Sequence, residues 1–287
     1  MTSLHAMKHH VAIVTDSTAS IPPDVAEQLN ICVIQLELTI GDQENDERRI
    51  PHAELAQALR DGTHVETGPP PPPAFFWNYN DAASSGAEAI VSVHISEGLS
   101  QTCQSARTAA EEISLPVFVV DSRLCGLGMG FPVIAAAEAA AAGGSTQGVL
   151  GVLDRRLRST TQMIYVDTLE YLRRSGRVGR AQAFFGQALS IKPVLVLREG
   201  ILEPMVKGRG PERALKKAIR EAVARAGYGP VDIGIEHFQY GERAHEIAEQ
   251  LRAQLPQARR VVVAETSAII GAHAGPGALG LTVSPAT

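Results

Sequence analysis

The stretch Val11-Ala-Ile-Val-Thr-Asp-Ser17 decides the fold class, because a short apolar run passes directly into small polar residues. Similar apolar runs occur at Ile31–Ile40, Ala89–Ile95 and Val117–Val120, and most of them are separated by segments with helical periodicity. Continuous apolar runs of this length are typical of parallel strands that are buried on both faces. The sequence therefore predicts an α/β protein with a parallel, doubly wound sheet in this half.

Helices are predicted between these strands from apolar periodicity and from end signals such as Gly143-Gly144. The predicted ranges are Pro23–Leu29, His52–Leu59, Ala74–Ala83, Ser100–Glu112, Phe131–Ala142 and Gln147–Leu157. The five-proline run Pro69–Pro73 is expected to follow a stiff polyproline II path that holds Thr67 against the next helix.

The second half repeats the alternation of strands and helices. Glu199-Gly200 is the predicted turn of a hairpin. Strands are predicted at Met163–Val166, Lys192–Leu197, Val231–Ile235 and Val261–Ala264, and amphipathic helices at Glu212–Arg225 and Glu242–Leu255. A chain of 287 residues has room for two medium-sized domains. We therefore predict two α/β domains, residues 1–158 and 159–287, with a ligand cleft between them.

Charge and composition exclude several classes of protein. The net charge of −5 argues against binding of nucleic acid, which requires a dense basic face. The first ten residues lack the apolar stretch of a signal peptide, and no run of about 18 apolar residues follows, so we expect a cytoplasmic protein. Cys32, Cys103 and Cys125 lie outside any CxxC pair, so neither a disulfide framework nor a metal site is expected.

Short polar clusters follow several predicted strands, namely Thr15-Asp16-Ser17, Ser96, Asp121-Ser122 and Asp167-Thr168. Ligands of open parallel sheets bind beyond the carboxyl ends of the strands, where hydroxyl groups and helix amino termini suit an anionic head group. Ser, Thr and Asp are also the preferred helix caps, so each cluster taken alone has a structural interpretation.

Two further segments carry polar groups that could meet an anion. His273 lies in the glycine-rich stretch Gly271–Gly277, which we expect to be a loop, and a histidine there could donate to a ligand or could simply be exposed. The segment Tyr171–Arg180 contains four arginines in eight residues. It could bind an acidic group or form a solvated basic turn.

No self-contained catalytic motif is present. The segment Gly275–Gly280 matches GxGxxG but lies too near the carboxyl terminus to open a dinucleotide-binding unit. A P-loop, HExxH and GxSxG are absent from the sequence. No cofactor is therefore expected.

Five segments together resemble one known family, the DegV proteins. Thr15–Pro22, Ile95–Thr102, Leu169–Val178, Ile191–Pro193 and His273–Gly277 resemble its TDSTADLP, ISSGLSGT, LEYLKKGGRI, NIKPIL and HTGPG segments. The resemblance covers nearly the whole chain. It implies two α/β domains that hold a long-chain fatty acid, of roughly 14 to 18 carbons, between them.

The resemblance also implies a role. Some members of the family are carriers for fatty acid kinase, in which a separate ATP-binding subunit phosphorylates the bound carboxylate for phospholipid synthesis. By this resemblance the chain would be a lipid-binding carrier and not an enzyme. Its partners would be the fatty acid and the ATP-binding kinase subunit, and contact with membranes would be transient.

Individual positions can be matched to the family segments. Thr67, Ser96 and His273 match the positions implied to bind the carboxylate, and Arg177 matches an arginine implied to lie near it. Ser17, from the first strand-end cluster, completes the candidate ligand-binding set.

Glu97 is the main departure from the family pattern, because it replaces a serine. An ionised Glu97 beside a bound carboxylate would repel it, so either the side chain points away or the head-group site differs from that of the family. Gln101, Gly68-Pro69 and Lys207 depart as well. The alternative function is an enzyme or sensor that uses the same cleft for another small carboxylate.

Overall fold

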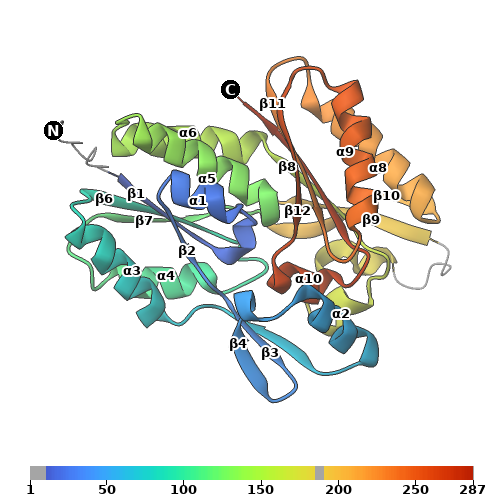
Figure 1. The fold of residues 1–287 in the computed structure, drawn as a ribbon, viewed down its shortest axis with the longest axis horizontal. Coiled ribbons are helices and arrows are strands. Elements are labelled where there is room, and N and C mark those ends of the chain that lie inside the picture. The colour runs from blue at the N-terminus through green and yellow to red at the C-terminus, as the bar shows by residue number, and fades with distance from the viewer. Residues whose placement is uncertain (1–10, 185–190, 287) are drawn as a thin grey trace.

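The computed structural model of the chain describes residues 11–184 and 191–286 (Figure 1). The amino-terminal segment 1–10, on which the prediction about a signal peptide depends, lies outside the described residues. Within those two ranges, no helix has both the length and the apolar character needed to cross a bilayer.

The first sheet has the strand order β2-β1-β6-β7, and every neighbouring pair is parallel. Its strands are β1 (Val11–Asp16), β2 (Ile31–Ile34), β6 (Ala89–His94) and β7 (Val117–Asp121). The predicted parallel sheet in this half is confirmed, and so the polar clusters that follow β1, β6 and β7 lie at one edge of it.

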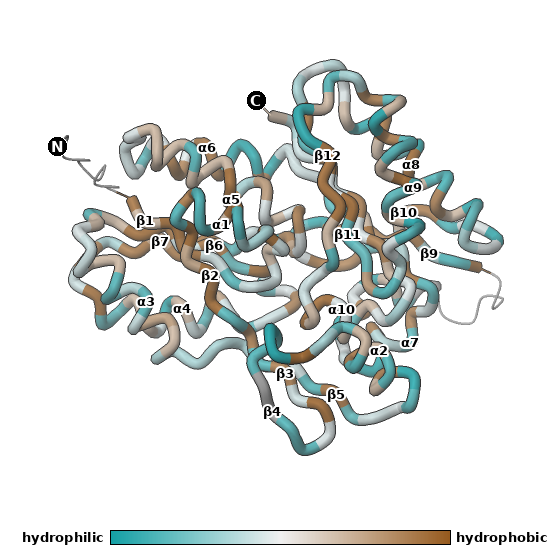
Figure 2. Tube along the Cα trace, viewed as in Figure 1, coloured by the Kyte–Doolittle hydropathy of each residue, from teal (hydrophilic) through white to brown (hydrophobic). Residues whose placement is uncertain are grey.

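Helices cover both faces of this sheet (Figure 1). Phe75 and Tyr79 of α3 (Pro72–Ser84) are fully buried in one cluster with Val14 of β1, and α4 (Thr102–Ala110) contributes to the same cluster. On the opposite face, Phe131 of α5 (Gly126–Ala141) shares a cluster with Val91 of β6. Figure 2 accordingly shows apolar strands between helices with polar outer faces.

The proline run departs in part from its predicted path. Pro71 has the expected extended backbone, with φ −68° and ψ 151°. Pro72 and Pro73 instead form the first turn of α3, where the missing proline N–H leaves no helical hydrogen bond unmade.

The predicted single strand Ile31–Ile40 is wrong, because the chain leaves the first sheet after β2. The N–H group of Leu36 donates to Ser17 Oγ at 3.2 Å instead of to a neighbouring strand. The chain then forms β3 (Glu37–Ile40) in a separate antiparallel sheet of order β4-β3-β5, with β4 (Gln43–Asp46) and β5 (Val65–Gly68).

The sheet of the second half has the order β10-β9-β8-β13-β11-β12, and only the β11–β12 pair is parallel. Its strands are β8 (Thr161–Tyr165), β9 (Ile191–Arg198), β10 (Ile201–Arg209), β11 (Val231–His237), β12 (Ala258–Glu265) and β13 (Leu279–Pro285). The predicted hairpin is confirmed, because β9 and β10 pair on either side of Glu199-Gly200. The sequence pattern missed β13, which lies in the interior of the sheet.

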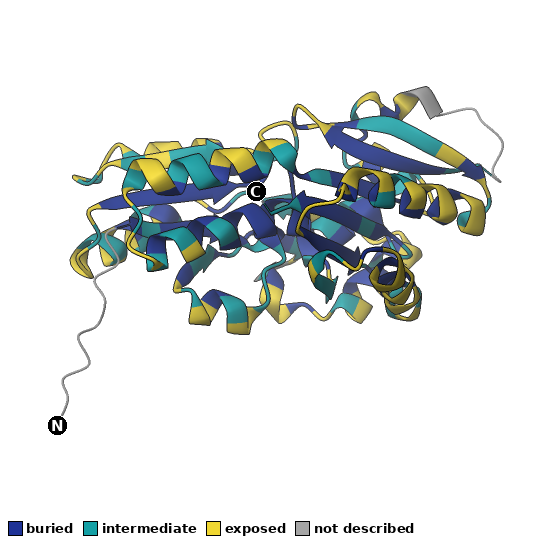
Figure 3. Ribbon diagram, turned by 90° about the horizontal axis from the view of Figure 1, so that it is seen from above, coloured by how far each residue is buried: buried dark blue, intermediate teal, exposed yellow. Residues whose placement is uncertain are grey.

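Two amphipathic helices, α8 (Pro211–Ala226) and α9 (Gly241–Gln254), pack against this second sheet as predicted. Figure 3 shows their exposed outer faces and the buried strands beside them. The other elements are α1 (Pro23–Gln28), α2 (His52–Asp61), α6 (Thr146–Ser159), α7 (Glu170–Arg174), α10 (Ala268–Ala274) and the 3-10 turns η1 (Ser17–Ala19), η2 (Glu47–Arg49) and η3 (Gly179–Phe184).

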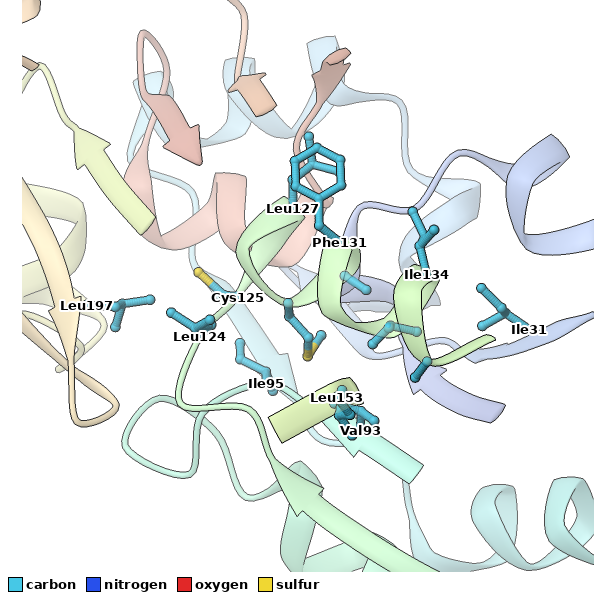
Figure 4. Packing of buried hydrophobic residues seen from close by; sticks show 14 of the residues in the cluster. Ile31, Val93, Ile95, Leu124, Cys125, Leu127, Phe131, Ile134, Leu153 and Leu197 are labelled. Atoms are coloured by element: carbon cyan, nitrogen blue, oxygen red, sulfur yellow. The ribbon is translucent and has the colours of Figure 1, made fainter. Parts of the chain in front are cut away.

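A single apolar cluster joins the two sheets. Figure 4 shows Leu197 of β9 beside Leu124 and Cys125, which lie between β7 and α5, and all three are buried in the same cluster. The predicted domain boundary at 158/159 falls at the end of α6, and the division into two domains stays a prediction.

Candidate functional site

A cavity of about 410 Å³ lies where the connections of the first sheet meet α10 and the second sheet. Most of its lining is apolar, and a few polar side chains share the wall. The apolar side chains are Leu36, Pro69, Ile95, Leu99, Cys125, Ile164, Leu172, Leu202, Ile269, Ile270 and Ala274, and the polar ones are Thr67, Glu97, Ser100, Gln101, Arg177 and His273. The cavity therefore combines a long apolar wall with a limited set of groups that can bind a polar head.

Thr67 and His273 are the two predicted residues that the fold brings into direct contact. Thr67 comes from β5, and its Oγ1 lies 2.8 Å from Nε2 of His273. His273 stands in the last turn of α10, so the predicted loop at Gly271–Gly277 is in part a helix. Ser267 starts this helix, because its side chain accepts a hydrogen bond from the N–H group of Ile269.

Gly275 ends α10 and thereby holds His273 at the cavity. Its backbone is left-handed, with φ 80°, and a side-chain carbon at this position would collide with the ring of Tyr171 from α7. The close approach of α7 to α10 therefore depends on glycine here.

The imidazole of His273 is electrically neutral at pH 7. Burial, with a contribution from the nearby Arg177 charge, lowers the pKa of His273 to about 4. If Nε2 carries the single ring proton, it donates to Thr67 Oγ1 and leaves the hydroxyl hydrogen of Thr67 free to donate to a ligand. The pair can therefore pass a hydrogen bond on to an anion.

Arg177 is the basic side chain of the cavity wall. Its Nη1 donates to the Ser175 carbonyl at 2.5 Å, and its Nε faces the Leu99 carbonyl at 3.4 Å. These backbone contacts fix the guanidinium group but use only part of its five N–H donors. The remaining donors and the positive charge can bind a carboxylate.

Glu97 also lines the cavity, and its carboxylate forms an ion pair with Arg107 of α4. Both side chains are partly exposed. Glu97 thus lines the cavity while its carboxylate is paired with a cation outside it, and its effect on a bound head group stays a prediction.

The chain is similar to known proteins over nearly its whole length. The family model described as "Uncharacterised protein, DegV family" matches residues 10–286. The chain belongs to the DegV family. A DegV domain-containing protein of Streptomyces coelicolor is 43% identical over 279 residues, which cover 97% of this chain and 99% of the relative.

Solved DegV structures share the fold. A DegV family protein from Thermus thermophilus, described for its fatty acid binding, matches with a TM-score of 0.92 and 32% identity over 96% of this chain and 100% of its own. DegV of Bacillus subtilis, described as a fatty acid binding protein, matches with a TM-score of 0.87 and 28% identity over 96% and 99% of the two chains. The predicted α/β, DegV-like fold is confirmed.

Two predicted ligand contacts of this DegV protein do not line the cavity. Ser96 is fully buried, and its Oγ donates to the Gly200 carbonyl at 2.8 Å and accepts from the Gly98 N–H at 3.1 Å. Ser17 Oγ accepts from Leu36, as described above. Both hydroxyls thus connect segments of the DegV fold, and their contact with a ligand stays a prediction.

Sequence reasoning did not select Ser100 or Gln101, which also line the cavity. Both belong to the segment Ile95–Thr102 that resembles the DegV pattern, so the signal was present without indicating which side chains face inward. Among the described residues, no group of three or more His, Cys, Asp or Glu side chains is arranged to hold a metal ion.

Proposed function

We propose that this DegV protein is a cytoplasmic carrier that binds a long-chain fatty acid in the 410 Å³ cavity. The observation that carries the proposal is the apolar cavity with Thr67, Arg177 and His273 in its wall. The hydroxyl of Thr67 and the guanidinium group of Arg177 would donate to the carboxylate, and His273 would orient Thr67. The fatty-acid binding described for the related structures supports the same function.

The size of the cavity supports a chain of the predicted length. An engineered protein cavity of about 150 Å³ binds benzene, which corresponds to roughly 25 Å³ for each carbon. On this scale 410 Å³ accommodates about 16 carbons. Each methylene moved from water into the cavity contributes about 0.8 kcal/mol, so a long tail provides most of the binding free energy.

Extraction of the purified protein under denaturing conditions, followed by mass spectrometry, tests this function. We expect a fatty acid of roughly 14 to 18 carbons, because the cavity has this capacity and apolar burial grows with each methylene. Delipidated protein should also show a rise in melting temperature when fatty acid is added. Repeated preparations without lipid, together with no thermal shift, would contradict the carrier function.

We further propose that a separate ATP-binding kinase subunit acts on the bound carboxylate, so that this chain is not itself an enzyme. The sequence contains no P-loop to cradle the phosphates of ATP. With radiolabelled ATP and fatty acid, we expect acyl phosphate only when a kinase subunit is supplied. Turnover by this chain alone would overturn this part of the proposal.

Contact with membranes would be transient and electrostatic. A groove between β10 and α8 is lined by six basic side chains, Lys207, Arg209, Arg213, Lys216, Lys217 and Arg220. Clusters of this size are attracted to anionic lipid surfaces. Co-sedimentation with anionic vesicles, but not with neutral ones, would support this contact.

A further inference from the structure

We infer that Glu97 makes the cavity selective for head groups with a single negative charge. The inference rests on the proposed function and adds a charge preference to it. Three observations carry it: Glu97 is part of the cavity wall, Arg177 is part of the same wall, and Arg107, the partner of Glu97, is not.

Glu97 lies close to the groups that would hold the carboxylate. Arg177 faces the carbonyl of Leu99, only two residues beyond Glu97, and all three residues line the cavity. The charge of Arg177 in turn lowers the pKa of His273, so these two side chains also lie near each other. An anion bound at Thr67 and Arg177 would therefore share one cavity with Glu97.

Arg107 pairs with Glu97 from outside the cavity. Arg107 projects from α4 and does not line the cavity, whereas Glu97 does. The hydrogen bond to Glu97 and the charge of Asp121 both raise the pKa of Arg107, as expected for a cation held among carboxylates. Of the Glu97–Arg107 pair, only Glu97 belongs to the lining of the cavity.

The charges in the wall match a monoanion. One negative charge on the ligand is balanced by Arg177, the single basic side chain among the described lining residues. A second negative charge would have no cation of its own in the wall and would be repelled by Glu97. A carboxylate would accordingly bind more tightly than a dianion with the same tail, such as a phosphorylated head group, and this difference favours release of a phosphorylated product.

Myristic acid and monotetradecyl phosphate test this inference, because they have the same number of carbons and different charge. At pH 8 the phosphate carries close to two negative charges, since its second pKa is about 6. We expect the delipidated wild-type protein to bind myristate more tightly than the phosphate in competition with a fluorescent fatty acid. Glu97→Gln should reduce this preference by about 5- to 10-fold, mainly by improving binding of the phosphate.

Two further variants test whether the effect comes from a charge in the cavity wall or from the overall charge of the protein. Glu249→Gln removes the same charge from an exposed position on α9 that pairs with Arg252 outside the cavity, so it should leave the preference unchanged. Arg107→Gln leaves Glu97 without its cation and should increase the preference. An unchanged preference in Glu97→Gln, or an equal change in Glu249→Gln, would overturn the inference. Failure of both probes to bind the wild-type protein would instead overturn the carrier function, and this inference with it.

Discussion

At the residue scale, the chemistry of the candidate site depends on the protonation of His273. Its ring is mostly buried and near Arg177, and both effects favour the neutral form. A neutral ring can hold Thr67 in one hydrogen-bonded orientation, whereas the positive charge toward the ligand comes from Arg177. In the proposed binding mode, recognition of an anion would thereby be divided among three side chains from different parts of the fold.

Replacement of His273 by Ala should weaken binding of a fatty acid by about 1.5 to 3 kcal/mol, roughly 10- to 150-fold, because a buried hydrogen bond to a charged group is lost or misaligned. Displacement of a fluorescent fatty acid measures the change. Thr67→Val removes the hydroxyl that would donate to the carboxylate and should weaken binding at least as much, since His273 acts through this hydroxyl. Wild-type affinity in His273→Ala would show that the imidazole takes no part in ligand binding.

The protonation of His273 should also appear in the pH dependence of stability. The pKa is about 4 in the folded protein and 6.5 for an ordinary histidine, so the unfolded chain binds more protons between these values. Lowering the pH from 6.5 to 4 should therefore cost the delipidated protein up to about 3 kcal/mol of unfolding free energy from this residue.

Comparison with His273→Gln isolates this effect. Burial raises the pKa values of Glu47 and Glu236, and these carboxyl groups contribute to the pH dependence with the opposite sign. Urea unfolding at several pH values should show a smaller loss of stability toward acid in the variant. Parallel pH profiles for the two proteins would argue against a buried neutral imidazole.

At the element scale, the β9–β10 hairpin is attached to the other half of the chain at its tip. The Gly200 carbonyl accepts from Ser96 Oγ at 2.8 Å, and Glu199 forms an ion pair with Arg123. Leu202, just after the turn, lines the cavity. The position of this hairpin therefore determines part of the cavity wall.

Gly98 allows the tip of the hairpin to lie this close. A side-chain carbon at Gly98 would lie 2.5 Å from the Gly200 carbonyl oxygen, so Gly98→Ala should destabilise the protein by about 1 to 3 kcal/mol through overpacking. Gly229→Ala is the matched control, because nothing lies within 4 Å of the added carbon. Denaturant unfolding measures both variants, and equal stabilities would mean that the tip shifts without cost.

At the scale of the whole molecule, a buried ion pair connects α6 to the second sheet. Arg156 of α6 and Asp232 of β11 are both buried, and Nη2 of the arginine lies 2.6 Å from Oδ2 of the carboxylate. Arg259 and Arg260 of β12 also pair with Asp232. One carboxylate thus pairs with three guanidinium groups, one from α6 and two from β12.

Removal of this carboxylate charge should be costly. We expect Asp232→Asn to lose about 3 to 5 kcal/mol of unfolding free energy, because it leaves Arg156 buried without a counter-charge. Asp154→Asn breaks an exposed pair with Arg158 on the same helix and should change the free energy by no more than about 0.5 kcal/mol. Chemical denaturation compares the two, and similar losses would contradict a special role for the buried pair.

The sequence by itself determined the features that local patterns encode. Apolar runs such as Val11–Val14 predicted the parallel strands of the first sheet, and periodicity predicted α8 and α9. The pair Glu199-Gly200 likewise predicted the turn of the β9–β10 hairpin. These signals are local, because a strand that is buried on both faces needs consecutive apolar residues. A helix that is buried along one side needs apolar residues at regular intervals.

Only the tertiary structure decided which polar side chains meet in the cavity. Thr67 and His273 are separated by 206 positions and come into contact because α10 packs beside β5. Glu97 lines the cavity and pairs with Arg107, while the side chain of its neighbour Ser96 donates to the hairpin. Adjacent residues in a turn point in directions set by what packs against them, and contacts between distant segments depend on how the elements dock, so no local pattern encodes either result.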